Sequence, residues 1–397
     1  TNFKSKVIGV SIKDRGGILP VGHTADAAYW FDDATGNWIT STYYMDALPT
    51  WVTNFNNKKI SEKYIKQDWN TLYPIESYSH SAADNNLYEG KLSGEKAPVF
   101  PHYLSKIFKG NNYGVIKTTP HGNQLTLDFA KEVLINEQMG KNGNTDFLAV
   151  SFSSTDYVGH KYGINAIETE DTYLRMDKHI EDLLNTLDAT IGKGEYTVFL
   201  SSDHGAAHNP LFLKDNKIPV ELLSMSKVLQ KLNIALENKF KQPNLVISLS
   251  SYQVNFNNPL IEKQALDLDE IKKFAIQFLK KQDGILYVVD MEKASISSIP
   301  ETVKTKIING YNPQRSGAIQ IILKPNFYAG GRTGTSHGTW NPYDTHIPLI
   351  FMGWGIKHGT TNRLTSMSDI ASTLAALLHI QEPNGNIGLP IEEVLQK

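Results

Sequence analysis

Four short apolar runs each end in a cluster of polar or small residues, and this pattern constrains the possible folds most strongly. The runs span Lys6–Ile12, Phe147–Phe152, Thr197–Leu200 and Ile347–Met352. Such runs are typical of buried strands in a parallel sheet, where functional loops follow the carboxyl ends of the strands. Stretches with helical spacing of apolar residues lie between them, at 123–138 and 168–191. We therefore predict an α/β fold, with a mostly parallel sheet sandwiched by helices.

One stretch, residues 225–330, has a different pattern. Strand-like runs and helical patterns are mixed there, and the stretch contains no histidine. We predict that 225–330 forms an inserted, smaller α+β subdomain that shapes access to the site and takes no part in its chemistry. Residues 1–224 and 331–397 are then expected to form one catalytic core.

Composition excludes several classes of function. The formal net charge of -2 over 397 residues lacks the basic bias that nucleic-acid or membrane-surface binding usually needs. The apolar stretches are shorter than the roughly 20 residues that span a bilayer. The chain has no cysteine, so a thiolate nucleophile or a cysteine zinc site is impossible. Any transition-metal site must use histidine and carboxylate ligands.

Such ligands follow the predicted strands. Asp156 and His160 lie four residues apart after the second apolar run, and Asp203 and His204 are adjacent after the third. His337 lies in a glycine-rich segment near the fourth run. Each feature alone also fits a helix cap, a surface histidine or a flexible loop. Together they place five ligands at one edge of one sheet, which predicts a zinc site with a position open for substrate.

At these residues the chain resembles the alkaline phosphatase superfamily, and within it the periplasmic, phosphate-irrepressible enzymes of flavobacteria. The segments that carry the resemblance are Ser11–Arg15, Gly22–Asp26, Ser153–His160, Ser201–Gly205 and Ser336–Gly338. The resemblance extends over essentially the whole chain. It implies two zinc ions, a periplasmic or secreted location and small phosphorylated substrates.

The same resemblance assigns the ligands. It implies that Asp156, His160 and His337 hold one zinc ion, and that Asp203 and His204 belong to the second. His208 and His346 lie close to these motifs, and we expect that they could orient ligands.

Lys13 and Arg15 follow the first predicted strand, two residues apart. Alternation along a strand would place both side chains on the same side, so that two cations could meet one phosphoryl group. From the residues alone, an exposed Lys-Asp-Arg turn is the favoured explanation. The resemblance favours the phosphate-binding role, because Lys-x-Arg matches the pair that binds the non-bridging phosphoryl oxygens in the family.

The family's threonine nucleophile, an upstream aspartate ligand and an asparagine have no counterpart in the chain. We therefore expect that the chain lacks its amino-terminal part, which could be present as a separate piece of an otherwise monomeric protein. The predicted activity is hydrolysis of phosphate monoesters through a phospho-threonine intermediate. The alternatives are a phosphodiesterase or nucleotide pyrophosphatase, a sulfatase, or a catalytically incomplete zinc-binding fragment.

Overall fold

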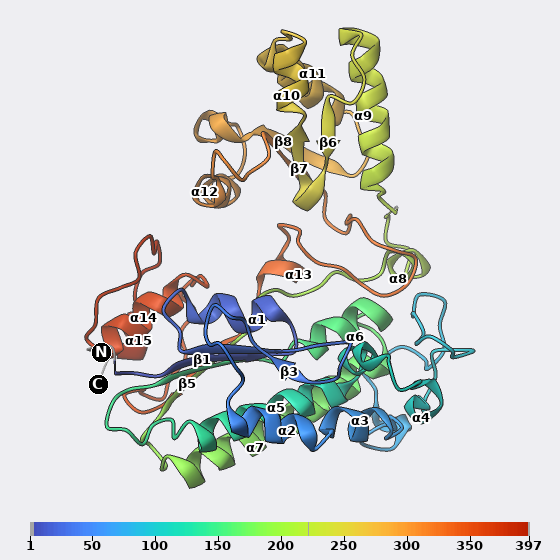
Figure 1. The fold of residues 1–397 in the computed structure, drawn as a ribbon. Helices are drawn as coiled ribbons and strands as arrows, with labels where there is room; N and C mark the ends of the chain where they lie inside the picture. Colours follow the sequence, from blue (N-terminus) through green and yellow to red (C-terminus); the bar gives the residue numbers. More distant parts are fainter. Residues whose placement is uncertain (1–3, 221, 396–397) are drawn as a thin grey trace. The chain divides into compact units, whose positions relative to one another are not determined.

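Figure 1 shows a computed structural model of the chain, which describes residues 4–220 and 222–395. The chain divides into two compact units. The first comprises the described residues of Thr1–Asp203 and Ile347–Lys397, and the second is His204–His346. The predicted subdomain 225–330 lies inside the second unit. Both chain crossings between the units, after Asp203 and after His346, fall beside residues that the sequence motifs single out.

The first unit contains a four-stranded sheet in the order β3–β2–β1–β4. Its strands are β1 (Val7–Ser11), β2 (Ala27–Phe31), β3 (Trp38–Ile39) and β4 (Phe147–Ser151). β1 pairs in parallel with both β2 and β4, so that Val10 lies opposite Tyr29 and Val150. β3 is antiparallel and forms one edge. The polar residues after β1 and β4 therefore emerge at the same edge of the sheet.

A second strand pair of this unit joins β5 (Thr197–Ser201) to β10 (Leu349–Gly353). The pair is antiparallel, unlike the parallel pairs around β1. Because Leu349 lies opposite Ser201, the chain enters β10 at the end where β5 finishes. The ring of Phe147 in β4 stacks on that of Phe199 in β5, with centroids 6.4 Å apart. This contact holds the pair against the four-stranded sheet.

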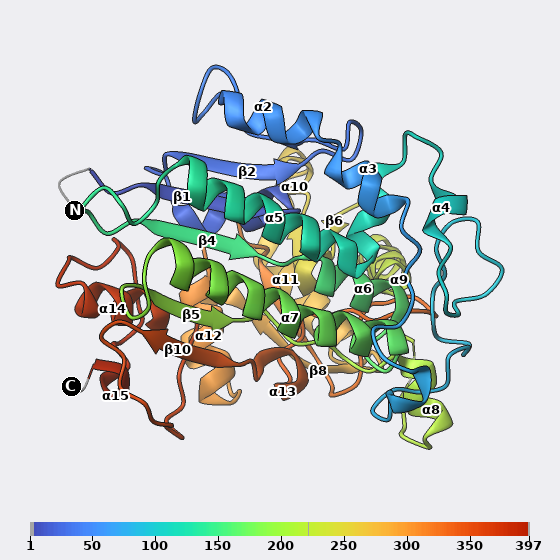
Figure 2. The ribbon, with the colours of Figure 1, turned by 90° about the horizontal axis from the view of Figure 1, so that it is seen from below.

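Helices cover both faces of the four-stranded sheet, as the two ribbon views show (Figures 1 and 2). α1 packs on one face, and α5 and α7 cover the other. The helices of this unit are α1 (Asp14–Ile18), α2 (Thr50–Asn57), α3 (Ile60–Ile65), α4 (Leu104–Ile107), α5 (Pro120–Asn136), α6 (Ser154–Tyr162), α7 (Ile167–Thr190), α14 (Asp369–Leu377) and α15 (Glu392–Leu395). The core between α5 and the sheet includes Val10 and Phe129, whose side chains are fully buried. Trp38 stacks on Phe129 at 4.2 Å.

α1 packs unusually close to the sheet because both partners are glycines. A Cβ atom on Gly9 of β1 would lie 1.9 Å from the carbonyl oxygen of Gly17 in α1. No larger residue fits at this position without moving the backbone. The close approach holds the segment that carries Lys13 and Arg15 against the sheet.

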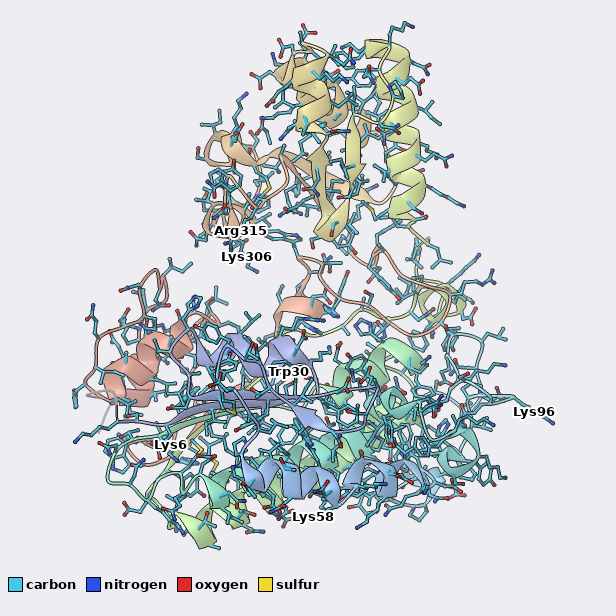
Figure 3. The ribbon with its side chains drawn as sticks, viewed as in Figure 1. Lys6, Trp30, Lys58, Lys96, Lys306 and Arg315 are labelled. Carbon is cyan, nitrogen blue, oxygen red and sulfur yellow. The ribbon has the colours of Figure 1, made fainter. Side chains whose placement is uncertain are left out.

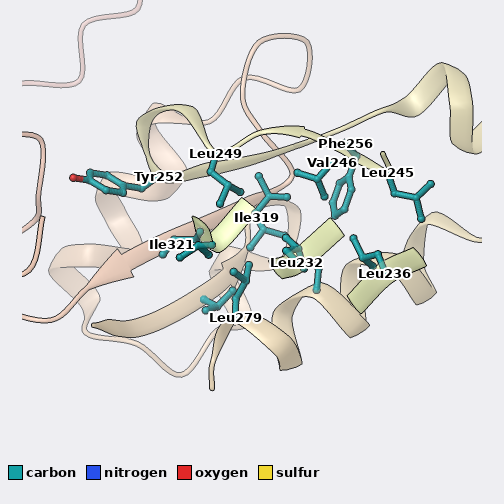
Figure 4. Close-up of a cluster of buried hydrophobic side chains, with 14 of the residues drawn as sticks. Leu232, Leu236, Leu245, Val246, Leu249, Tyr252, Phe256, Leu279, Ile319 and Ile321 are labelled. Carbon is teal, nitrogen blue, oxygen red and sulfur yellow. The ribbon is translucent and has the colours of Figure 1, made fainter. Parts of the chain in front are cut away.

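The second unit contains an antiparallel sheet in the order β6–β7–β9–β8. Its strands are β6 (Val246–Ser248), β7 (Gln253–Phe256), β8 (Ile285–Asp290) and β9 (Ile319–Leu323). Its helices are α8 (Pro210–Asp215), α9 (Met225–Phe240), α10 (Asn258–Lys263), α11 (Leu268–Leu279), α12 (Glu301–Gly310) and α13 (Pro342–Thr345). The apolar faces of α9 and α11 pack on this sheet around Leu232, Leu279 and Ile319 (Figure 4). The unit thus has its own hydrophobic core. No helix within 4–220 or 222–395 is long and apolar enough to cross a bilayer.

Candidate functional site

Lys13 and Arg15 both line one cavity of about 310 Å³, although the sheet does not position them as expected. β1 ends at Ser11, Lys13 precedes α1 as its N-cap residue, and Arg15 lies in the first turn of that helix. Strand alternation therefore does not apply to them. Lys13 is largely buried, whereas the Arg15 side chain is 71% exposed beside Asp14. The cavity can present one largely buried and one exposed cation to an anion.

Asp156 and His160 come together because both lie on α6, which begins three residues after β4 ends. The helix places them one turn apart, and His160 Nε2 lies 3.2 Å from Asp156 Oδ1. The other carboxylate oxygen, Oδ2, pairs with the ammonium of Lys13. Asp156 and His160 belong to a group of residues that could hold a metal ion. One carboxylate thus links the candidate metal site to the cavity that contains Lys13.

Asp203 and His204 follow β5 directly, as predicted. Asp203 is the last residue of the first unit in this part of the chain, and it is exposed. His204 Nδ1 lies 2.8 Å from the carbonyl oxygen of Gly205, so that Nδ1 acts as the donor. A Cβ atom at Gly205 would lie 2.1 Å from the carbonyl oxygen of Tyr343. The glycine is therefore required by a close backbone contact.

Within the second unit, His337 lies against His204. The two imidazole rings are stacked with centroids 3.4 Å apart. The loop that carries His337 is fastened to residues 207–209: Ala207 N donates to Ser336 O at 3.1 Å, and Asn209 Nδ2 donates to Gly334 O at 2.7 Å. These bonds position His337 although the loop contains no helix or strand.

Asp344 is a buried acid near this histidine pair that the sequence did not single out. The residue is 4% exposed, and its carboxylate accepts hydrogen bonds from Thr339 N and Oγ1, at 2.5 and 2.6 Å. Burial raises the pKa of Asp344, while these hydrogen bonds and the charge of His204 oppose the rise. No periodic pattern marks Asp344. The only sequence signal is its position two residues before His346.

The two other histidines near the motifs differ in their surroundings. His208 is half-buried and its ring stacks on Phe212 of α8 at 5.3 Å. Burial lowers its pKa. His346 is exposed. The expectation that either histidine orients a metal ligand remains a prediction.

Comparison with known proteins places the chain in a family. The sequence pattern of the type I phosphodiesterase / nucleotide pyrophosphatase family matches residues 4–346, and the chain belongs to this family. The family is part of the alkaline phosphatase superfamily that the sequence motifs indicate, so this recognition is confirmed.

Individual relatives match the chain along its whole length. It is 56% identical over 401 residues to a Myroides odoratus protein named calcium-transporting ATPase, covering 73% of that protein. It is 52% identical over 396 residues to the alkaline phosphatase PhoV of Synechococcus elongatus, covering 71% of it. It is 47% identical over 397 residues to the alkaline phosphatase PafA of Elizabethkingia meningoseptica, covering 72% of it.

The crystal structure of PafA superposes on the whole chain with a TM-score of 0.96, and the chain covers 76% of the crystallised protein. The predicted α/β fold class is thereby confirmed. A solved variant of PafA carries replacements of a threonine, an asparagine, a lysine and an arginine. The replaced lysine and arginine are two positions apart, the spacing of Lys13 and Arg15.

Proposed function

We propose that the chain is the metal-dependent catalytic part of a phosphatase that hydrolyses phosphate monoesters to an alcohol and inorganic phosphate. The observation that carries this proposal is the similarity of the whole chain to parts of two alkaline phosphatases, at 52% and 47% identity. The cavity that contains Lys13 and Arg15 supports it, because a monoester carries more negative charge than a diester and needs more cations. The phospho-threonine intermediate and a periplasmic or secreted location are proposed on resemblance alone.

The metal ligands are part of the proposal. Aspartate and histidine are ligands that suit zinc, and Asp156 and His160 already lie within 3.2 Å of each other. We propose that these two residues with His337 hold one zinc ion, and that Asp203 and His204 contribute to a second. When bound, such ions polarise phosphoryl oxygens and lower the pKa of an attacking hydroxyl group.

The side chains of the chain itself have separate tasks. Lys13 supplies a positive charge at a defined position, because Asp156 and the ring of Tyr157 hold its ammonium group. Arg15 is exposed and can close on the non-bridging oxygens of a bound phosphoryl group with its two-pronged guanidinium. Both charges stabilise the phosphoryl oxygens during transfer, which is the main electrostatic requirement of this reaction.

The experiment that tests the proposal compares hydrolysis of p-nitrophenyl phosphate and bis-p-nitrophenyl phosphate by the purified protein. Both assays are run with zinc and with a chelator, and the intact mass of the same sample is measured. We expect zinc-dependent turnover that is faster on the monoester. Absence of monoester turnover in a zinc-loaded sample would contradict the proposal.

A phosphodiesterase is the second candidate, because the matching family is named for phosphodiesterases and nucleotide pyrophosphatases. The same ligands would serve it, but the substrate would carry a second ester group and one negative charge less. Faster turnover of the diester would therefore favour this candidate. The name of the Myroides relative adds ATP as a third substrate for the same assay.

A further inference from the structure

The cavity that contains Lys13 has a second side, whose residues the proposed phosphate-binding role does not use. This side is formed by the turn after β2 and by the short helix η3 (Tyr113–Thr118). Trp30, which lies in β2 and is labelled in Figure 3, also lines the cavity. The side chains of interest are Trp30, Asp32, Asp33 and Lys117, and all of them belong to the first unit.

Lys117 and Asp33 form an ion pair on this side of the cavity. Lys117 Nζ lies 2.6 Å from Asp33 Oδ1. The Lys117 side chain is 15% exposed, whereas that of Asp33 is 52% exposed. The lysine is therefore held in place, and the aspartate is the more open partner of the pair. η3 approaches the turn closely: a Cβ atom on Gly114 would lie 3.1 Å from Asp33 Oδ2. The pair therefore has a defined position.

The ring of Tyr157 connects this pair to the phosphate-binding side. Lys13 Nζ lies 4.5 Å from the centre of that ring, and Lys117 Nζ lies 5.6 Å from the same centre. Both ammonium groups are thus within cation–π distance of one aromatic ring. A group esterified to a phosphate at Lys13 can therefore reach Lys117 and Asp33.

The charges on this side disfavour a second phosphate. Lys117 is the one cation there, whereas Asp32 and Asp33 supply two carboxylates. Asp32 is held as the anion, because hydrogen bonds from Thr35 lower its pKa. The ammonium and carboxylate of Lys117 and Asp33 can instead donate to and accept from hydroxyl groups, and the Trp30 ring offers a face for carbon atoms.

We propose that Trp30, Asp33 and Lys117 form a subsite for the leaving group, which selects monoesters of hydroxyl-rich alcohols such as polyols and sugars. The proposal rests on the phosphatase function proposed above and names its substrate class. Each hydrogen bond between a substrate hydroxyl group and this subsite should raise the affinity for the substrate a few-fold, since a net hydrogen bond is worth about 0.5–1.5 kcal/mol.

The test compares kcat/KM for glycerol 3-phosphate and n-propyl phosphate. Both are phosphate esters of a three-carbon primary alcohol, and only the first has two further hydroxyl groups. The two alcohols differ as leaving groups, but this difference is the same in every enzyme variant. The informative quantity is therefore the ratio of the two kcat/KM values in each variant, divided by the ratio in the unaltered protein.

We expect Lys117→Ala and Asp33→Asn to lower kcat/KM for glycerol 3-phosphate by about five- to tenfold, and that for n-propyl phosphate by less than about twofold. Asp33→Asn is nearly isosteric, so it tests the subsite even if Lys117→Ala does not fold. The matched control is Lys131→Ala, which removes a lysine paired with Asp182 at 2.8 Å outside this cavity. We expect the control to leave the ratio unchanged.

Equal losses on both substrates in both variants, or no loss on either, would overturn the subsite. A larger loss on ADP than on glycerol 3-phosphate would also overturn it, because Lys117 would then bind a second phosphate. Failure of the phosphatase proposal has a different signature, since the unaltered protein would not turn over p-nitrophenyl phosphate. Turnover of that compound with an unchanged ratio in the variants would refute the subsite alone.

Discussion

At the scale of single residues, Lys13 connects the two parts of the proposed chemistry. Its ammonium group pairs with Asp156 and also lies over the ring of Tyr157. Removing Lys13 therefore takes a cation from the cavity and also removes one ion-pair partner of the largely buried Asp156 carboxylate. Loss of phosphate binding must be distinguished from a disturbance of Asp156. Comparing a monoester with a diester substrate distinguishes the two effects.

We expect Lys13→Ala to lower kcat/KM for p-nitrophenyl phosphate by about 10²-fold, the usual effect of removing one group that stabilises transition-state charge. The loss on bis-p-nitrophenyl phosphate should be smaller, because the diester carries less negative charge. Parallel kinetics on the two substrates measure this. Lys58→Ala is the control, since Lys58 pairs with Glu132 at the surface. Equal losses on both substrates would refute the phosphate-binding role of Lys13.

At the scale of elements, the segment 66–103 shows how buried polar contacts replace regular structure. Between α3 and α4 it contains one short 3-10 helix (Ile75–Ser77) among its described residues. Within it, His102 is fully buried and contacts Glu95 at 2.8 Å and Glu168 of α7 at 3.1 Å. Glu89 of the same segment is 6% exposed. The segment is thus attached to α7 by groups whose charge depends on pH.

The pKa shifts of Glu89 and His102 change the free energy of unfolding in the same direction. Burial, and next the charge of Glu168, raise the pKa of Glu89 to about 8. Burial opposes the charge on His102, but hydrogen bonds to Glu168 and Glu95 outweigh it and raise the pKa of His102 to about 9. Both groups bind protons more tightly in the folded chain. Their stabilisation is complete below the unfolded pKa, 4.5 for Glu89 and 6.5 for His102, and is lost as pH rises towards 8 and 9.

We therefore expect the contribution of Glu89 and His102 to the free energy of unfolding to fall between about pH 5 and pH 9, and Glu89→Gln to make the pH dependence over this range shallower. The glutamine is neutral at every pH and does not carry the cost of ionising a buried acid. Urea denaturation at a series of pH values measures the slope. Glu76→Gln, at an exposed position of the same segment, is the control. An unchanged slope in Glu89→Gln would contradict the expectation.

At the scale of the whole molecule, the histidines of the second unit have a simple distribution. All four, His204, His208, His337 and His346, lie in 204–208 and 337–346, at the two ends of the unit. The core around β6–β9 contains none. The proposed ligand set joins Asp156 and His160 to His337, which is distant in sequence, so only the folded chain would bind the metal fully.

A metal that binds the folded chain and not the unfolded chain raises its stability by mass action. We expect zinc at about 100 times its Kd to stabilise the protein by about 2.7 kcal/mol, and a chelator to lower the melting temperature. His337→Ala should lose most of the zinc-dependent shift. His358→Ala, at an exposed position in the first unit, should keep it. A full shift in His337→Ala would exclude His337 from the ligand set. Thermal denaturation with and without zinc gives these values.

Local sequence patterns predicted much of the fold. The apolar runs at 147–152 and 197–200 form β4 and β5, and the helical pattern at 168–191 forms α7. Within 225–330, α9 begins at Met225, where the Ser224 hydroxyl caps it by accepting a hydrogen bond from Lys227 N. Strand alternation was the wrong reason for pairing Lys13 with Arg15, since a helix begins between them.

Local sequence patterns were enough to predict β1, β4, β5 and β10 and the residues that follow them, but not β2 or β3. Buried strands need continuous apolar side chains, and metal or phosphate chemistry needs a small set of residue types, so both leave local patterns. Tertiary structure alone decided the direction of β10, the approach of Asp344 to His204, the burial of His102 and the meeting of Lys117 with Asp33. Each of these depends on residues distant in sequence, and a local pattern does not specify its distant partner.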